Sequence, residues 1–352
     1  LAGQFLSGSE SWYFVSIAAV TLISEACISI VTCHMRAEGD AWKFFWSGIA
    51  RLGLHIAFNL FFLVYLQLGL LGIFLGSLAS SVLIAATILP YTIRRAGLTV
   101  SKVSVKLLLG FGGPLILANV AQFYLGGIDR FFLEHFRDLA NVGIYALAAR
   151  LAQSFLVLIY EPFEQLWDPE KYRIWQTSRD IQPFQRVFRL LTLILVVFGV
   201  GISVMAAEIF ALLASKPFAS ASVVAPVLIA AAMCTALTRF ARFGSLAEGK
   251  TANVYKAALM AAVVVTLLLY LLTPRFGPMG AAFAVVIAAG VRVFIENRMA
   301  SRLVNLQLPW RSFMGLATIG VLVTIGCLQI GPISIGNVFL KLGVLAGFAA
   351  AM

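Results

Sequence analysis

The sequence predicts an all-α protein that crosses a membrane many times. Of its 352 residues, 61% are hydrophobic and only 12% are charged, whereas soluble domains carry about twice this charged fraction. The mean hydropathy is +0.97, and apolar runs of the roughly 20 residues that a bilayer-spanning helix needs recur along the whole chain. A third observation, a repeat of two glycine motifs, indicates that the helices form two similar groups.

Three predicted spans come first. The run 12–33 ends at the turn that holds Gly39, and the run 44–67 ends just before a Gly-x-x-Gly sequence. The run 70–90 ends at Pro90, beyond which basic residues begin. Each run is long enough to cross about 30 Å of hydrocarbon as a helix.

Eight more spans follow, which makes about eleven transmembrane helices in all. They cover 107–128, 142–166, 188–214, 223–243, 254–273, 279–298, 312–331 and 338–352. Pro114, after two glycines, interrupts the first of these runs. A proline removes a backbone hydrogen bond, which membrane helices tolerate beside protein or a water-filled cavity. A bent helix lining polar space is therefore predicted there. The polar stretch 167–186 is predicted to be the longest loop.

The glycine motifs give the domain organisation. Ala37-Glu38-Gly39 recurs as Ala247-Glu248-Gly249, and Gly69-x-x-Gly72 recurs as Gly277-x-x-Gly280. Two matches at nearly one offset indicate a six-helix repeat, with the two copies parallel because six is even. We therefore expect two pseudo-symmetric lobes, the first incomplete. Residues 1–106 are the second half of the N-terminal lobe, 107–304 the C-terminal lobe, and 305–352 two additional helices. The chain is expected to be truncated at both ends.

The distribution of Lys and Arg predicts the orientation. Alternate connections on one side of the membrane hold eighteen of these residues: Arg36, Lys43, Arg94, Arg95, Lys102, Lys106, Lys171, Arg173, Arg179, Arg186, Arg189, Arg239, Arg242, Lys250, Lys256, Arg298, Arg302 and Arg311. The other side holds only Arg130, Arg137, Lys216 and Arg275. By the positive-inside rule the basic loops are cytoplasmic and the chain start is external.

This topology accounts for the net charge of +11, so nucleic acid is not expected as a partner. Cys27, Cys33, Cys234 and Cys327 lie in or beside apolar runs, and His55 has no acidic residue at ligand spacing. We expect no cofactor, no metal site and no catalytic residues.

Several motifs resemble one known family. Asp129-Arg130-Phe-Phe-Leu, followed by Asn141-Val-Gly-Ile-Tyr-Ala-Leu-Ala148, resembles the second-half signature of the polysaccharide-transport, Wzx-type flippases. These belong to the multidrug/oligosaccharidyl-lipid/polysaccharide exporter superfamily. The Ala-Glu-Gly and Gly-x-x-Gly motifs are similar to the same family. The resemblance implies two six-helix lobes around a central cavity, with the spans here as helices four to fourteen. It also implies flipping of an undecaprenyl-pyrophosphate-linked oligosaccharide, an O-antigen or exopolysaccharide unit, across the bacterial inner membrane by alternating access. Lipid-linked oligosaccharide and membrane lipid are then the partners, and other polysaccharide-assembly proteins are candidates.

Charged residues inside spans are costly and therefore mark candidate sites. Arg150 lies eight residues into its predicted helix, about 12 Å deep, and a guanidinium offers a planar fork of donors that suits a pyrophosphate. Glu161 is too far along the same helix to pair with it. The alternative is a structural pair with another helix.

A polar stripe, Arg51, His55 and Asn59, recurs every four residues of the second span. It lines a substrate path or packs against a neighbouring helix. Glu25, near the middle of the first span, binds and releases a proton or is a hydrogen-bonded structural acid.

The remaining candidates lie in the fourth span and near the ends of others. Asn119 and Gln122 offer neutral donors to a sugar or hydrogen-bond another helix. Asp129 and Arg130, at the predicted outer helix end, form a local salt bridge or a periplasmic gate. Arg292 is expected to pair with Glu296 one turn later, and Lys341 is expected to snorkel to the interface.

Three alternative functions are compatible with a polytopic membrane protein. A multidrug or peptidoglycan-precursor exporter of the same superfamily is the alternative transporter, although cationic drugs would favour acidic rather than arginine-containing spans. A membrane-embedded polysaccharide polymerase or glycosyltransferase needs a sizeable polar domain, and the external connections are too short for one. A non-transporting scaffold is the third reading.

Overall fold

The computed structural model describes residues 11–97, 101–213 and 220–328, together with Lys341, Val344 and Gly347. Every regular element in these stretches is a helix, and nine of the helical segments are long and apolar enough to cross a membrane. The chain divides into two compact units, Leu1–Ser101 and Lys102–Met352, and each has its own packing.

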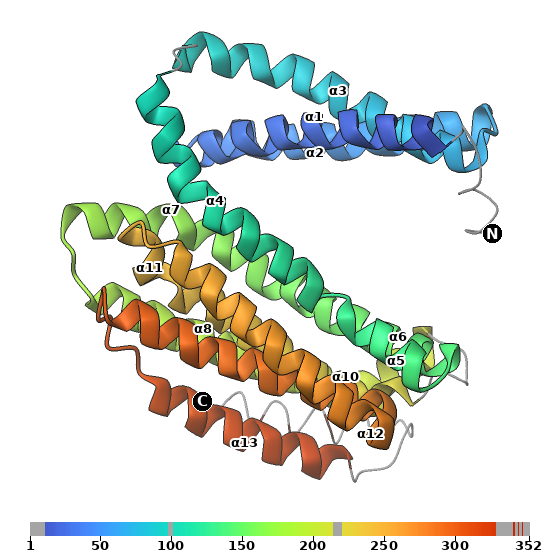
Figure 1. The fold of residues 1–352 in the computed structure, drawn as a ribbon, viewed down its shortest axis with the longest axis vertical. Helices are drawn as coiled ribbons and strands as arrows, with labels where there is room; N and C mark the ends of the chain where they lie inside the picture. Colours follow the sequence, from blue (N-terminus) through green and yellow to red (C-terminus); the bar gives the residue numbers. More distant parts are fainter. Residues whose placement is uncertain are drawn as a thin grey trace. The chain divides into compact units, whose positions relative to one another are not determined.

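The first unit holds three long helices and a short π-helical turn: α1 (Ser11–Ala37), α2 (Ala41–Leu60), η2 (Phe61–Tyr65) and α3 (Gly69–Ala96). α1 and α2 both pack against α3 (Figure 1). Ile28 of α1 is buried against Ile84 and Ala85 of α3. This small core fixes the faces that the three helices turn towards one another.

The second unit contains the remaining helices: α4 (Lys102–Leu125), α5 (Ile128–Phe136), α6 (Leu139–Phe155), η3 (Leu156–Tyr160), α7 (Glu161–Thr177), α8 (Gln182–Val204), α9 (Ala206–Leu213), α10 (Ala221–Ala241), α11 (Phe243–Ala247), α12 (Ala252–Ser301) and α13 (Trp310–Leu328). α10 is central and packs against α6, α8 and α12. Its buried positions include Ala225, Ala232 and Ala236. Small side chains let membrane helices approach closely, so these alanines make α10 the hub of the unit.

Two turns of the first unit recur in the second with the same backbone conformation. Gly39 and Gly249 have φ values of +77° and +66°, and Gly69 and Gly277 both have φ +56°. Residues with a side chain adopt positive φ only at a cost. The repeat seen in the sequence is therefore also a repeat of backbone geometry.

The last glycine of each copy permits a close helix contact. A Cβ on Gly72 would lie 2.9 Å from the carbonyl oxygen of Phe62, and a Cβ on Gly280 would lie 2.3 Å from that of Leu272. Side-chain carbons do not approach backbone oxygens so closely. At both places the glycine packs its bare backbone against the helical segment before the positive-φ glycine: η2 before α3, and the part of α12 that precedes Gly277.

This contact predicts a large difference between two glycines of α12. Gly280→Ala is expected to lower the free energy of unfolding by about 1–3 kcal/mol, the usual cost of overpacking. Gly290→Ala is the matched control, because nothing lies within 4 Å of its Cβ position and alanine favours a helix over glycine by about 1 kcal/mol. Thermal unfolding in detergent measures both variants, and equal melting temperatures would contradict the packing at Gly280.

The predicted spans agree well with the helices, with one merger. The spans 254–273 and 279–298 are both present but are continuous in α12, which breaks its helical conformation only at Gly277 (φ 56°, ψ −134°). The span 188–214 corresponds to α8 and α9, and 338–352 lies almost wholly outside the described residues. α4 is unbroken through Pro114 and changes direction along its length (Figure 1).

The fourth predicted span, 107–128, matches α4, which ends at Leu125, and a turn at 126–127 separates it from the short helix α5. Two predictions about other positions along the chain were wrong. The stretch predicted as the longest loop is helical to Thr177, where α7 is supported by local ion pairs that hydropathy does not register. Lys341 does not snorkel: its side chain is buried and its Nζ lies 2.6 Å from the Glu208 carboxylate of α9.

The connection from α5 to α6 is well defined. Arg137 follows α5, and its guanidinium donates to the carbonyl oxygen of Pro274 at 2.8 Å. Asp138 then caps α6 by accepting from the backbone N–H of Asn141 at 2.8 Å. That bond, with a second one from the Asn141 side chain, lowers the pKa of the Asp138 carboxyl.

Candidate functional site

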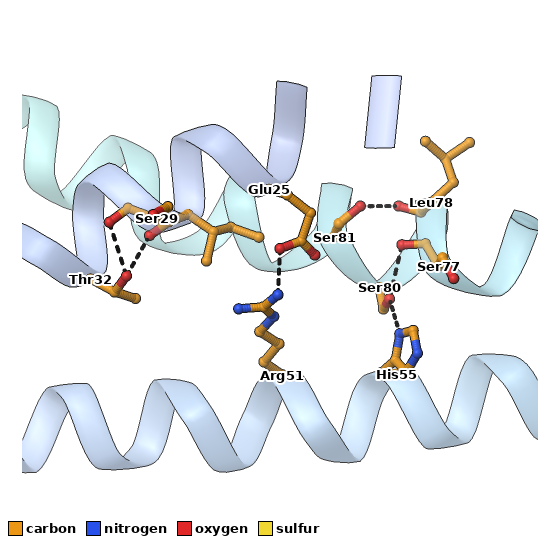
Figure 2. Close-up of polar contacts among 10 residues, drawn as sticks. Glu25, Ser29, Thr32, Arg51, His55, Ser77, Leu78, Ser80 and Ser81 are labelled. Carbon is orange, nitrogen blue, oxygen red and sulfur yellow. Dashed lines mark hydrogen bonds and ion pairs between the residues drawn. The ribbon is translucent and has the colours of Figure 1, made fainter. Parts of the chain in front are cut away.

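In the first unit, the polar stripe of α2 meets polar groups of α1 and α3 (Figure 2). The Arg51 guanidinium forms an ion pair with the Glu25 carboxylate of α1. His55 Nδ1 lies 3.3 Å from Ser80 Oγ of α3, and Ser80 Oγ also donates to the carbonyl oxygen of Ser77 at 3.0 Å. Because a serine hydroxyl has one proton, His55 Nδ1 must be the donor to Ser80.

Asn59 continues the stripe but bonds within its own helix. Its Nδ2 donates to the carbonyl oxygen of His55 at 2.8 Å, and a Cβ on Gly76 of α3 would lie 3.0 Å from its Oδ1. The stripe is therefore the face that α2 turns towards its neighbours. The structure pairs Glu25 with Arg51 of the next helix, a contact between two spans that the sequence did not predict.

This ion pair can be tested on stability. Glu25→Ala and Arg51→Ala are expected to lower the melting temperature by similar amounts, and the double variant is expected to lower it hardly further. The coupling energy should be about 0.5–1 kcal/mol, since both side chains are partly exposed. A double-mutant cycle by thermal unfolding measures it, with Arg173→Ala as an unrelated arginine control. Strictly additive effects would show that the pair does not form.

In the second unit, Asp129 lies at the start of α5, just beyond the end of α4, and its side chain is buried. Its Oδ2 accepts from the Tyr145 hydroxyl at 2.6 Å, and its Oδ1 accepts from the backbone N–H of Arg130 at 2.8 Å. The Arg130 side chain is exposed. The predicted local salt bridge is thus replaced by a bond from a tyrosine of α6 that joins α5 to α6.

Gln122 belongs to a chain of polar contacts between α4 and α12. Arg292 Nη1 donates to Gln122 Oε1, and Arg292 Nε lies 3.2 Å from Glu296 Oε1. Glu296 is 2% exposed, and the described residues offer no partner to its other oxygen. The predicted Arg292–Glu296 pair forms, and Gln122 makes a helix-to-helix bond with it.

A second cluster of charges lies at the junction of η3, α7 and α10. Glu164 Oε2 lies 2.9 Å from Arg239 Nη1, and Glu164 Oε1 accepts from the Tyr160 hydroxyl at 3.3 Å. The Arg239 guanidinium also stands 5.6 Å from the centre of the Tyr160 ring. The sequence reading missed this cluster, because Arg239 was assigned only to a basic connection. The one available signal was that Glu164 follows Tyr160 at helical spacing.

Arg150 stands apart from these paired charges. It lies eleven residues after the start of α6 at Leu139, about 16 Å along the helix axis. Its side chain is exposed on its unit, and within the described part of the chain nothing pairs with its guanidinium. Asn119 of α4 is likewise exposed. These two polar side chains remain available to a ligand.

The described residues contain no group of three His, Cys, Asp or Glu side chains that could hold a metal ion. The candidate residues above offer guanidinium groups, amides and hydroxyls, all carried on membrane helices. The nine helical segments long and apolar enough to cross a membrane, in the part of the chain that the structure describes, define a multi-pass membrane protein.

Comparison with known proteins gives the family. Residues 2–223 match the family described as polysaccharide biosynthesis protein, and the chain belongs to that family. None of the curated protein sequences matches it. Together with the structural neighbours, the match places the chain among the flippase-like transporters of the multidrug/oligosaccharidyl-lipid/polysaccharide exporter superfamily, which are not enzymes.

The structural neighbours share the fold at low identity. A lipid II flippase MurJ in an inward closed conformation has a TM-score of 0.65 at 14% identity, covering 96% of this chain and 73% of its own. A MATE in complex with MaL6 has a TM-score of 0.62 at 16% identity, covering 84% and 70%. The crystal structure of a MATE mutant has a TM-score of 0.61 at 16% identity, covering 87% and 73%.

Proposed function

We propose that this polysaccharide biosynthesis transporter flips an undecaprenyl-pyrophosphate-linked oligosaccharide, the repeat unit of an O-antigen or exopolysaccharide. The movement runs from the cytoplasmic to the periplasmic leaflet of the bacterial inner membrane, by alternating access. The family match supports a role in polysaccharide biosynthesis, and the fold supports transport. The substrate must then be a lipid whose polar head is too large and too charged to cross unaided.

Arg150 is the residue on which the proposed substrate mainly rests. Of the three arginines predicted inside spans, Arg51 is paired with Glu25 and Arg292 with Glu296, whereas Arg150 has no described partner. A lone guanidinium about 16 Å into a membrane helix is costly unless it meets an anion or water. The pyrophosphate of the lipid is an anion whose oxygens match the guanidinium fork.

The other candidates take supporting roles in this proposal. Asn119 donates to the sugars, now that Gln122 is engaged with another helix. Arg51, His55 and Asn59 line the substrate path through their shared polar face, whereas Gln122 ties α4 to α12 through its bond with Arg292. Glu25, Asp129 and Arg130 couple transport to an ion or form a gate that controls passage of the substrate.

The proposed orientation puts the basic connections in the cytoplasm and the chain start outside. Contacts within the second unit support the grouping of alternate connections on the same side, whereas the choice of side rests on the Lys and Arg distribution. Arg137 reaches Pro274 at 2.8 Å, joining two predicted outer turns. Gln185 reaches the carbonyl oxygen of Gln307 at 3.2 Å, joining two predicted inner connections. We further propose that residues 1–106 and 107–304 belong to two pseudo-symmetric lobes, followed by additional helices in 305–352.

Depletion of the protein in its host tests the function. Surface polysaccharide should fall at least tenfold, and lipid-linked oligosaccharide should accumulate in the cytoplasmic leaflet, where only enzymes added to inside-out vesicles reach it. Unchanged surface polysaccharide after complete depletion would refute the proposal.

A peptidoglycan precursor is the second candidate substrate, because the first structural neighbour is named a lipid II flippase. The same depletion separates the two. Arrested cell-wall synthesis with normal surface polysaccharide would favour the precursor, and the reverse result would favour the oligosaccharide. Other polysaccharide-assembly proteins are proposed partners only if the substrate is the lipid-linked oligosaccharide.

A further inference from the structure

A cavity of about 250 Å³ lies in the second unit, where the end of α12 meets the connection to α13. Its polar lining comes from Asn297 and Ser301 on α12 and from Asn305 and Gln307 on the connection, and Trp310 at the start of α13 adds an indole. The volume equals that of about eight water molecules, which is enough for one small polar ring. None of the functions assigned above uses this cavity.

The chemistry of the lining selects an uncharged ligand with many hydroxyl groups. No charged side chain lines the cavity, so an ion would find no counter-charge there. Three amides and a hydroxyl can each donate and accept. Within the described residues nothing hydrogen-bonds the side-chain amides of Asn297 or Gln307, so both remain free for a ligand. An indole adds a flat apolar face with one N–H donor, and a sugar ring presents hydroxyls at its edge and C–H groups on its face.

The connection is held in place although it is not helical. Gln185 Nε2 of α8 donates to the carbonyl oxygens of Leu306 and Gln307 at 3.3 Å and 3.2 Å. Leu306 is buried in a cluster with Phe184 and Phe243, and the Trp310 ring lies 5.0 Å from that of Phe188. A site held in shape before binding loses less entropy when the ligand arrives.

The backbone conformation of Gln307 is a second indication that the cavity is a binding site. Its φ is +48°, a conformation that costs a residue with a side chain free energy and that recurs at ligand sites. A glycine would adopt it freely. The chain instead keeps a long amide at this position, at the exposed rim of the cavity.

We infer that this cavity is a sugar-binding subsite, which receives one neutral sugar residue of the oligosaccharide on the side of the membrane where the basic connections lie. The inference rests on the proposed function for the source of the sugar. Arg298 and Arg302 flank the lining residues in sequence. The subsite would hold the head group by its sugars on the side from which the lipid enters.

Binding to the purified full chain in nanodiscs tests the subsite. The probe is the oligosaccharide released by mild acid from the host's lipid-linked pool, measured by calorimetry. Asn297→Ala and Gln307→Gly are each expected to weaken binding about tenfold, the value of one or two hydrogen bonds. Gln307→Gly removes the amide while relieving the positive φ, so loss of folding cannot explain its effect. Gln176→Ala, an exposed glutamine of α7, should bind as the wild type does.

The outcomes separate this inference from the proposed function. Equal binding by wild type, Asn297→Ala and Gln307→Gly would overturn the subsite, as would no binding by a wild-type protein that still flips the lipid. Binding of the free oligosaccharide that both variants weaken would support the subsite. If that same wild-type protein then failed to move the lipid-linked form in liposomes, the proposed function would fall and the sugar site would stand.

Discussion

Replacing Arg150 with alanine is expected to lower export of the oligosaccharide at least tenfold while the protein stays folded. The side chain is exposed and has no described partner, so its removal leaves no buried carboxylate without a cation. Such changes usually alter stability by no more than about 0.5 kcal/mol. Each hydrogen bond from a charged group to the pyrophosphate contributes about 1.5–3 kcal/mol, and every 1.4 kcal/mol changes affinity about tenfold.

Two further variants make the Arg150 result specific. Arg150→Lys keeps the charge but loses the planar fork, so export should fall between wild type and alanine. Arg173→Ala removes an arginine whose side chain is 76% exposed and pairs, among the described residues, with Glu170, and it should export normally. Surface polysaccharide in the host, normalised to the amount of membrane protein, is the measurement. Full export by Arg150→Ala would remove this residue from the mechanism.

Arg292→Ala should produce the largest loss of stability, about 3–5 kcal/mol. Its side chain is 11% exposed and that of Glu296 is 2% exposed, and removing one partner strands the other as a buried charge. Gln122 would also lose the donor that ties α4 to α12. The two helices should therefore loosen, and the melting temperature in detergent should fall sharply.

The double variant Arg292→Met with Glu296→Leu is the control for this prediction. Replacing both charges by apolar side chains of similar size removes the stranded charge, so most of the lost stability should return. Gln122→Leu should cost much less than Arg292→Ala, because it leaves the Arg292–Glu296 pair intact. A double variant as unstable as Arg292→Ala would mean that packing, and not the buried charge, decides the loss.

The spans could be predicted from hydropathy because a bilayer restricts the backbone conformations that a chain can adopt within it. Every backbone polar group within it must be satisfied inside the helix, so a long apolar run has one structure. The Arg292–Glu296 pair was predictable because the two residues are one helical turn apart.

The partners of the other interior charged residues depend on which helices pack against one another. A single sequence does not show which helices do so. Arg51 and Glu25 are 26 residues apart, Gln122 and Arg292 are 170 apart, and Lys341 and Glu208 are 133 apart. Hydropathy likewise missed α5, because its charged and polar residues conceal a helix whose Asp129 is buried and bonded to Tyr145. The candidate residues could be picked out from the sequence because they are charged or polar residues inside apolar spans. Their contact partners could be identified only from the folded structure.

The most direct test of the account is transport by the purified protein in liposomes that contain the lipid-linked oligosaccharide. The fraction of substrate open to an added glycosidase reports how fast it crosses the bilayer. Liposomes with the wild-type protein should expose the whole pool, whereas those with Arg150→Ala should expose only the outer half, as protein-free liposomes do. Wild-type liposomes that behave like protein-free ones, with the protein folded and correctly inserted, would contradict the account.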